Sequence, residues 1–181
     1  ILLQNNNDVL PLKSAKRILV TGPMADAPYD QLGTWAFDGE EAYTVTPLTA
    51  LRKDYEVVYE PALAYSRDAS TAGIPAAVAA ARSVDAVVAF VGEEAILSGE
   101  AHSLSQINLQ GAQSELIKAL KATGKPVVVV VIAGRNLTIE RDLENCDAML
   151  YSFHPGTMGG EALADLITGR AVPSGKSPVT F

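Results

Sequence analysis

The sequence contains a single cysteine, Cys146, which excludes an intrachain disulfide and any metal site built on paired thiolates. Basic residues are also few, because 14 Lys and Arg are scattered among 21 Asp and Glu, for a formal net charge of −7. Phosphate backbones bind clustered Lys and Arg. The composition therefore argues against nucleic acid as a partner, and no metal pair is suggested by the spacing of the two histidines.

Long hydrophobic runs are missing as well. The longest apolar run, residues 127–133, is far shorter than the roughly 20 residues of a membrane-spanning helix, and β-branched residues dominate it. We therefore predict a buried strand there and no membrane partner. The chain begins at Ile1 without an initiator Met or a basic leader, and it begins on an apolar segment, as expected for a piece of a longer polypeptide.

What is present is enough for one folded domain over residues 1–181. Hydrophobic residues make up 48% of the chain and charged residues only 19%, a balance that is typical of globular proteins rather than disordered ones. A length of 181 residues lies within the usual range of a single core. No internal repeat or linker divides the sequence.

Short β-branched runs alternate with helix-like segments, the pattern of βαβ units. The strands are predicted at 17–21, 56–60, 86–91, 127–132 and 148–153, and the helices at 74–83, 112–122 and 160–168. The strands are unbroken apolar runs, which indicates burial on both faces and helices on both sides. We predict an α/β fold, a three-layer α/β/α sandwich with a mainly parallel sheet. Residues 29–47 show neither the period of a helix nor that of a strand, and they are expected to form a functional loop or packed irregular structure.

Two glycine-bearing segments follow strands and have both a binding and a structural interpretation. Gly22-Pro23-Met24-Ala25-Asp26 occupies the place of a nucleotide-binding loop, yet it lacks the G-x-G-x-x-G spacing of that loop, and no P-loop occurs. Residues 154–161 open a helix whose N–H groups are a potential anion site. For both segments we favour a structural turn, and a nucleotide-binding, flavodoxin-like domain is the least favoured function.

Ionisable residues concentrate in the segment 91–103, directly after a predicted strand. Glu93, Glu94, Glu100 and His102 lie here with two glycines, at the kind of strand end where α/β proteins carry their chemistry. The simplest interpretation is solvated acidic side chains. A general acid at neutral pH needs a raised pKa, which burial or nearby carboxylates can supply. Glu93 and Glu94 are candidates to tune Glu100.

The only tryptophan, Trp35, falls in the irregular segment rather than in a periodic apolar run. It is either a partly buried core ring or a stacking platform for a flat apolar face such as that of a sugar.

Several segments, which occur in the same order along the sequence, together resemble the C-terminal α/β sandwich domain of glycoside hydrolase family 3, the β-glucosidase and β-xylosidase family. The resemblance covers essentially the whole chain. The segments are Ile1-Leu2-Leu3-Gln4-Asn5 with Val9-Leu10-Pro11-Leu12, residues 20–26, Gly33-Thr34-Trp35, residues 91–93 through 99–103, residues 120–127, Gly134-Arg135, Pro155-Gly156 with Gly159-Gly160, and Pro173-Ser174-Gly175-Lys176.

The resemblance implies a retaining glycosidase acting on terminal β-linked glucosyl or related residues, without a cofactor. In the family an N-terminal TIM-like barrel provides an Asp nucleophile, and the sandwich domain provides a Glu acid/base, which maps onto Glu100. Trp35 and His102 are the expected substrate contacts. The barrel of the same polypeptide and a β-glucoside are the implied partners, and a periplasmic or secreted parent is expected. A non-catalytic sugar-binding or interdomain scaffold module is the alternative, and Glu93 or Glu94 remains open as the acid/base.

Overall fold

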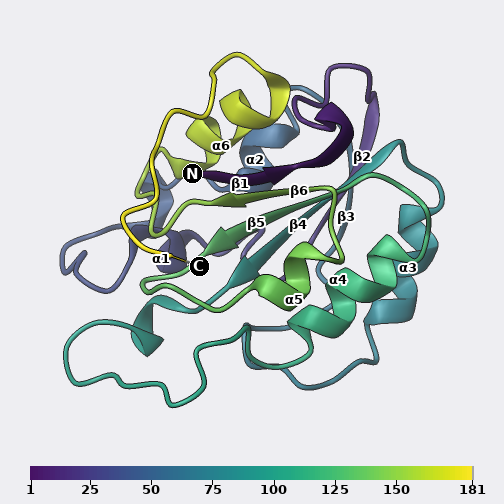
Figure 1. Ribbon diagram of the computed structural model, residues 1–181. Helices are drawn as coiled ribbons and strands as arrows, with labels where there is room; N and C mark the ends of the chain where they lie inside the picture. Colours follow the sequence, from purple (N-terminus) through teal and green to yellow (C-terminus); the bar gives the residue numbers. More distant parts are fainter. Residues whose placement is uncertain (181) are drawn as a thin grey trace.

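Six strands form one sheet in the order β1-β6-β5-β4-β2-β3 in the computed structural model, which describes residues 1–180 (Figure 1). Neighbouring strands run parallel except β1, which pairs antiparallel with β6. The predicted mainly parallel sheet is confirmed. The strands are β1 (Leu2–Asn5), β2 (Arg17–Thr21), β3 (Glu56–Glu60), β4 (Ala86–Gly92), β5 (Val127–Ile132) and β6 (Ala148–Tyr151).

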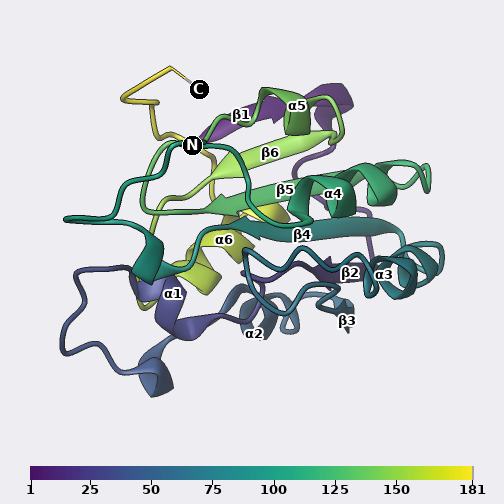
Figure 2. The ribbon, with the colours of Figure 1, turned by 90° about the horizontal axis from the view of Figure 1, so that it is seen from below.

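Helices cover both faces of this sheet, as predicted (Figures 1 and 2). One core cluster joins the sheet to α3 and α4, and a second joins its other face to α2 and α6. The α-helices are α1 (Pro28–Leu32), α2 (Pro47–Leu51), α3 (Ile74–Ala81), α4 (Gln113–Lys121), α5 (Glu140–Leu143) and α6 (Gly159–Thr168). Short 3₁₀ turns lie at η1 (Asn6–Asp8), η2 (Glu41–Tyr43) and η3 (Ala95–Leu97).

The central strands β4 and β5 are buried at every residue. Their side chains alternate between the two cores: Val87, Ala89 and Val91 face one, whereas Val88 and Phe90 face the other. This explains the unbroken apolar runs, since both faces of a parallel sheet are covered by helices. The strand ends are therefore rigid platforms for the loops that follow them.

Strand β1 was not predicted as a strand. Its four residues are only half-buried and include two amides. The Gln4 side chain instead donates hydrogen bonds to the carbonyls of Leu143 and Cys146, at 3.0 and 2.9 Å. An edge strand that uses polar side chains in this way carries no apolar alternation for a sequence pattern to detect.

The segment 29–47, expected to be a loop or irregular structure, contains η2 and most of α1, and ends at the first residue of α2. Helix α2 begins with two standard signals that the prediction missed: the hydroxyl of Thr46 accepts a hydrogen bond from the Thr49 N–H, and Pro47 is the first helical residue. Both helices have five residues, too few to show a helical period.

The two glycine-bearing turns have structural roles in the fold. Gly22 has φ +93°, and a Cβ there would lie 2.1 Å from the carbonyl oxygen of Phe90 in β4. At the start of α6, the Gly160 N–H donates to the Val45 carbonyl at 3.0 Å. The N–H groups at this helix start are therefore partly engaged within the fold, which supports the structural interpretation of both turns. Among residues 1–180, no helix has both the length and the apolar character needed to cross a membrane.

Candidate active site

The acidic loop leaves the carboxyl end of β4, in the middle of the sheet. Gly92 ends the strand with φ +142°, where a Cβ would lie only 1.7 Å from the Ile132 carbonyl oxygen of β5. The chain then passes through the buried Glu93 and the turn η3 before it reaches the exposed Glu100. The first residues of the loop are therefore held against the sheet, whereas Glu100 is exposed to solvent.

Glu100 lies at the exposed tip of this loop, between Gly99 with φ +100° and Ala101 with φ +63°. Within residues 1–180, its carboxylate makes neither a hydrogen bond nor an ion pair. Its carbonyl oxygen lies 2.8 Å from His102 Nδ1, so His102 contacts the backbone of Glu100 rather than its carboxylate. The Glu100 side chain is therefore available to an external partner.

The loop that carries Trp35 is bonded to the acidic loop. The Thr34 hydroxyl donates to the Ala95 carbonyl at 2.6 Å and lies 2.8 Å from the Ser98 hydroxyl. A Cβ on Gly99 would lie 2.7 Å from Thr34 Cγ2 and 3.4 Å from Trp35 Cζ2. The fold therefore brings Trp35 beside the residue that precedes Glu100, although 65 positions separate Trp35 from Glu100 in the sequence.

Trp35 does not lie in the core. Its side chain is 60% exposed, and its ring meets that of Phe37 edge-to-face with centroids 5.9 Å apart. An exposed indole held by a second ring has the geometry of a stacking surface.

Glu93 and Glu94 have partners of their own. Glu93 Oε2 accepts from Arg135 Nε at 2.9 Å; burial raises the pKa of Glu93, whereas the bond and the charge of Arg135 oppose that rise. Glu94 accepts from the Ser66 hydroxyl at 2.5 Å and lies 3.5 Å from Arg67 Nε. Within the described chain, neither carboxylate contacts Glu100, so a tuning role for them has no contact to support it.

Arg135 was not among the predicted site residues, although it belongs to one of the segments that resemble the family. It follows β5, the parallel neighbour of β4, and besides Glu93 it donates to the carbonyls of Leu97 and His102. An acidic residue after one strand and a basic residue after the next was a signal for this contact, because consecutive parallel strands end at the same edge of a sheet.

His154, after β6, also lies under the loops. A Cβ on Gly33 would be 2.5 Å from His154 Nδ1, and a Cβ on Gly134 would be 2.6 Å from His154 Cε1. Burial lowers the pKa of His154, because the charged imidazolium is disfavoured away from water. Small residues at Gly33 and Gly134 therefore let the loops around this ring pack closely.

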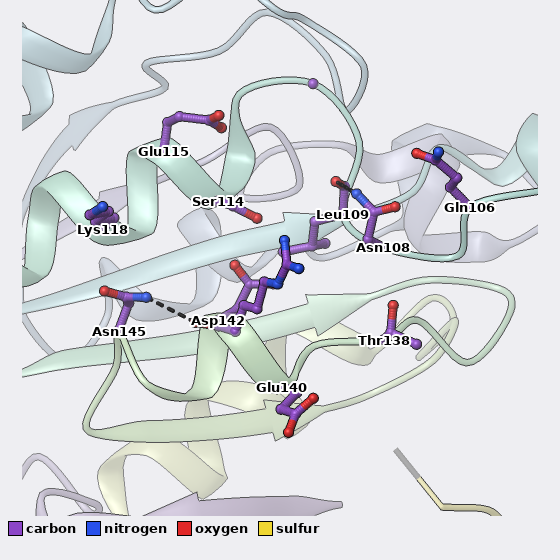
Figure 3. A pocket seen from close by; sticks show the side chains of 12 residues that line it. Gln106, Asn108, Leu109, Ser114, Glu115, Lys118, Thr138, Glu140, Asp142 and Asn145 are labelled. Carbon is purple, nitrogen blue, oxygen red and sulfur yellow. Dashed lines mark hydrogen bonds between the residues drawn. The ribbon is translucent and has the colours of Figure 1, made fainter.

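A cavity of about 720 Å³ lies elsewhere, between α4, α5 and residues 106–111 (Figure 3). Acidic and basic side chains both line it, and burial raises the pKa of Asp142 there. None of Trp35, Glu100 and His102 lines it. Across residues 1–180 there is no group of three or more His, Cys, Asp or Glu side chains that could hold a metal ion.

Residues 1–181 match the family model of the glycosyl hydrolase family 3 C-terminal domain. The chain is 36% identical to the periplasmic β-glucosidase of Salmonella typhimurium, with all of this chain and 27% of that protein covered. It is 35% identical to a β-xylosidase of Formosa agariphila, again over the whole chain and 26% of the relative. The chain thus spans about a quarter of the length of these relatives.

Solved structures agree with the sequence relatives. The β-glucosidase of Listeria innocua in complex with isofagomine superimposes with a TM-score of 0.88 at 37% identity, covering 94% of this chain and 24% of that one.

Proposed function

The chain belongs to the glycosyl hydrolase family 3 C-terminal domain family, and on that basis we propose that it is the C-terminal domain of a retaining β-glycosidase, with Glu100 as the general acid/base. The substrate class is a terminal β-linked glucosyl or related residue. Residues 1–181 form one domain of a longer polypeptide, in which an N-terminal barrel carries the Asp nucleophile. A periplasmic or secreted location is part of the same proposal.

The observation that carries the role of Glu100 is that its carboxylate has no hydrogen bond or ion pair to any residue of 1–180, at the exposed end of an anchored loop. A retaining glycosidase needs one carboxyl group that protonates the leaving oxygen and later removes a proton from water, while a second carboxylate attacks the anomeric carbon. Glu93 is a poorer candidate, since its side chain is 1% exposed and paired with Arg135. Glu94 is engaged by Ser66.

Trp35 and His102 are the proposed substrate contacts. The exposed face of Trp35, beside Gly99, suits stacking against a sugar ring next to the scissile bond. His102 is exposed and two residues from Glu100, within reach of the same substrate region. No cofactor is required by this chemistry.

The proposed division of catalytic groups predicts that the 181-residue chain alone does not hydrolyse an aryl β-glucoside. Without the nucleophile there is no route to the glycosyl-enzyme intermediate. The measurement compares this chain with the longer polypeptide at equal concentration. Appreciable turnover by the 181-residue chain would overturn the division.

The role of Glu100 is tested in the longer polypeptide with Glu100→Ala. Because general acid catalysis contributes roughly 10²–10⁴-fold, we expect a loss of that order in kcat/KM with a poor leaving group. The loss in kcat/KM should be much smaller with 2,4-dinitrophenyl β-glucoside, whose leaving group needs no proton. The kcat for this activated substrate should still fall, because water attack on the glycosyl-enzyme loses its general base, and added azide should restore it.

The matched control is Glu144→Ala, which removes an exposed glutamate on the α5 side of the domain and should change neither rate. Equal losses of Glu100→Ala on both substrates would point to Glu93 or Glu94 as the acid/base. Full activity of Glu100→Ala would favour the scaffold alternative, in which this domain contributes no catalytic group.

A further inference from the structure

We propose that Arg135 is a positioning residue that fixes the backbone on both sides of Glu100, and that Glu93 in turn holds Arg135. The proposal rests on the proposed function of Glu100. It assigns a role in the reaction to two residues that do not touch the substrate region.

The Arg135 guanidinium uses all three of its nitrogens. Nε donates to Glu93 Oε2 at 2.9 Å, Nη2 donates to the Leu97 carbonyl, and Nη1 lies 3.4 Å from the His102 carbonyl in a long hydrogen bond. Leu97 precedes Glu100 by three residues, and His102 follows it by two. One planar group therefore joins the two sides of the loop whose tip is Glu100.

Glu93 provides the fixed end of this arrangement. It is fully buried directly after β4, and its own N–H donates to the Ile132 carbonyl of β5 at 2.9 Å. Within residues 1–180, Arg135 is the one charged partner of this buried carboxylate, so a movement of Glu93 would break that ion pair, and Glu93 is a rigid acceptor for Arg135. The Arg135 side chain is itself 19% exposed, and its hydrogen bonds to Glu93 and Leu97 are partly buried, so water competes little for these two bonds.

The backbone of Arg135 is anchored as well. The Tyr151 hydroxyl of β6 donates to the Arg135 carbonyl at 2.5 Å and accepts from the Leu137 N–H at 3.1 Å. Contacts to Glu93, directly after β4, and to Tyr151 of β6 therefore hold both ends of Arg135. By contrast, residues 99–103, which carry Glu100, are all exposed. The Arg135 side chain therefore connects the exposed loop to the rigid sheet.

Lysine cannot replace this arginine. An ammonium is a single charge on a flexible stem and lacks the planar fork that reaches several acceptors at once. Arg135→Lys would keep the pairing with Glu93 while losing at least one of the two loop carbonyls. A displacement of about 1 Å in a catalytic group can cost on the order of 10²-fold in rate.

The experiment uses the longer polypeptide and compares Arg135→Lys and Arg135→Ala with Arg82→Ala, an exposed arginine after α3. For Arg135→Lys we expect kcat/KM, which reports formation of the glycosyl-enzyme, to fall at least about tenfold with a poor leaving group. The fall should be less than about threefold with 2,4-dinitrophenyl β-glucoside, since only the poor leaving group needs the general acid. Arg82→Ala should match the parent on both substrates.

Two further readouts separate positioning from folding. Guanidinium ion added to Arg135→Ala should raise turnover of the poor substrate, because it can occupy the vacated site beside Glu93. Thermal unfolding measures how much folded enzyme each variant retains, and rates are compared per folded molecule.

Glu93→Gln, which keeps the shape but removes the charge that holds Arg135, should show the same dependence on leaving group as Arg135→Lys.

Equal losses of Arg135→Lys on both substrates, per folded molecule, would overturn the positioning role. Glu100→Ala, measured beside it, distinguishes the two proposals. If Glu100→Ala shows the leaving-group dependence and Arg135→Lys does not, only the positioning role fails. If Glu100→Ala shows none, the proposed function itself fails.

Discussion

A single methyl group at Gly99 tests whether the contact between the Trp35 loop and the acidic loop sets the position of Glu100. A Cβ added there would lie 2.7 Å from Thr34 Cγ2, whereas carbon atoms pack at about 3.5 Å or more. Gly99→Ala must therefore separate the two loops by about 0.8 Å. Because misplacing a reacting group by about 1 Å costs on the order of 10²-fold, we expect a loss of about 10- to 100-fold in kcat with a poor leaving group.

Gly99→Ala also places an alanine at a positive φ, and a control variant must account for the stability lost through that backbone strain. Gly99 has φ +100°, and a non-glycine residue held in such a region costs about 1–3 kcal/mol. Gly124, after α4, has φ +76° and no heavy atom within 4 Å of an added Cβ. Gly124→Ala is therefore the matched control, with a similar backbone strain and no displaced neighbour.

Both variants are measured in the longer polypeptide, for stability by urea denaturation and for kcat with a poor and an activated leaving group. Each should lose about 1–3 kcal/mol of unfolding free energy, but only Gly99→Ala should lose turnover of the poor substrate. A kcat for Gly99→Ala within about twofold of that for Gly124→Ala would refute the reasoning, because a shift of the expected size would then be without effect on the reaction.

Two predictions concern the 181-residue chain itself. Leu116→Ala truncates a fully buried side chain of α4 and should lower the unfolding free energy by about 2–5 kcal/mol in urea denaturation, while Val172→Ala, at a position 82% exposed, should leave it unchanged; equal effects would contradict the assigned core. Burial lowers the pKa of His154 from its ordinary value of 6.5, so the unfolded chain binds the proton more readily and stability falls as the pH drops below that value. His154→Gln should therefore show a shallower loss of stability between pH 7 and pH 5, and an unchanged slope would show that the imidazole titrates alike in both states.

The sheet was predictable because its central strands are buried on both faces. Runs such as 86–92 and 127–132 have no polar interruption and are rich in β-branched residues, which is typical of strands covered by helices on both faces. Edge strand β1 and the five-residue helices α1 and α2 were not predictable in this way. Strand β1 obtains its order from partners far along the chain, such as the carbonyls that Gln4 reaches in and after α5. Helices α1 and α2 are too short to show a helical period, and only the local signals Thr46 and Pro47 mark the start of α2.

Some features of the candidate site were likewise predictable from the sequence, and others were not. The position of Glu100 after β4 was visible in the sequence, since a strand end and its loop are local features. The partners of the loop were not. Thr34, Ser98 and Arg135 come together only through the order of strands in the sheet, and the exposed state of Trp35 depends on the loop against which it lies.

A general acid has two requirements that conflict in a small domain. Its carboxyl group must be open to a substrate, yet it must be held within a fraction of an ångström, and exposed loops are the least ordered part of a fold. The arrangement here separates the requirements. Glu100 lies in a glycine-bearing loop that solvent reaches, while Tyr151 ends strand β6 and Glu93 is buried directly after strand β4.

Arg135 connects the rigid and the exposed parts through hydrogen bonds to backbone carbonyls, which do not depend on the loop's side chains. An exposed position such as Ala101 can therefore vary in its side chain while the loop keeps its position. It follows that substitutions at exposed loop positions such as Ala101 or Ser103 should change the binding of the substrate's leaving portion more than the rate of proton transfer, whereas substitutions at Arg135 should do the reverse.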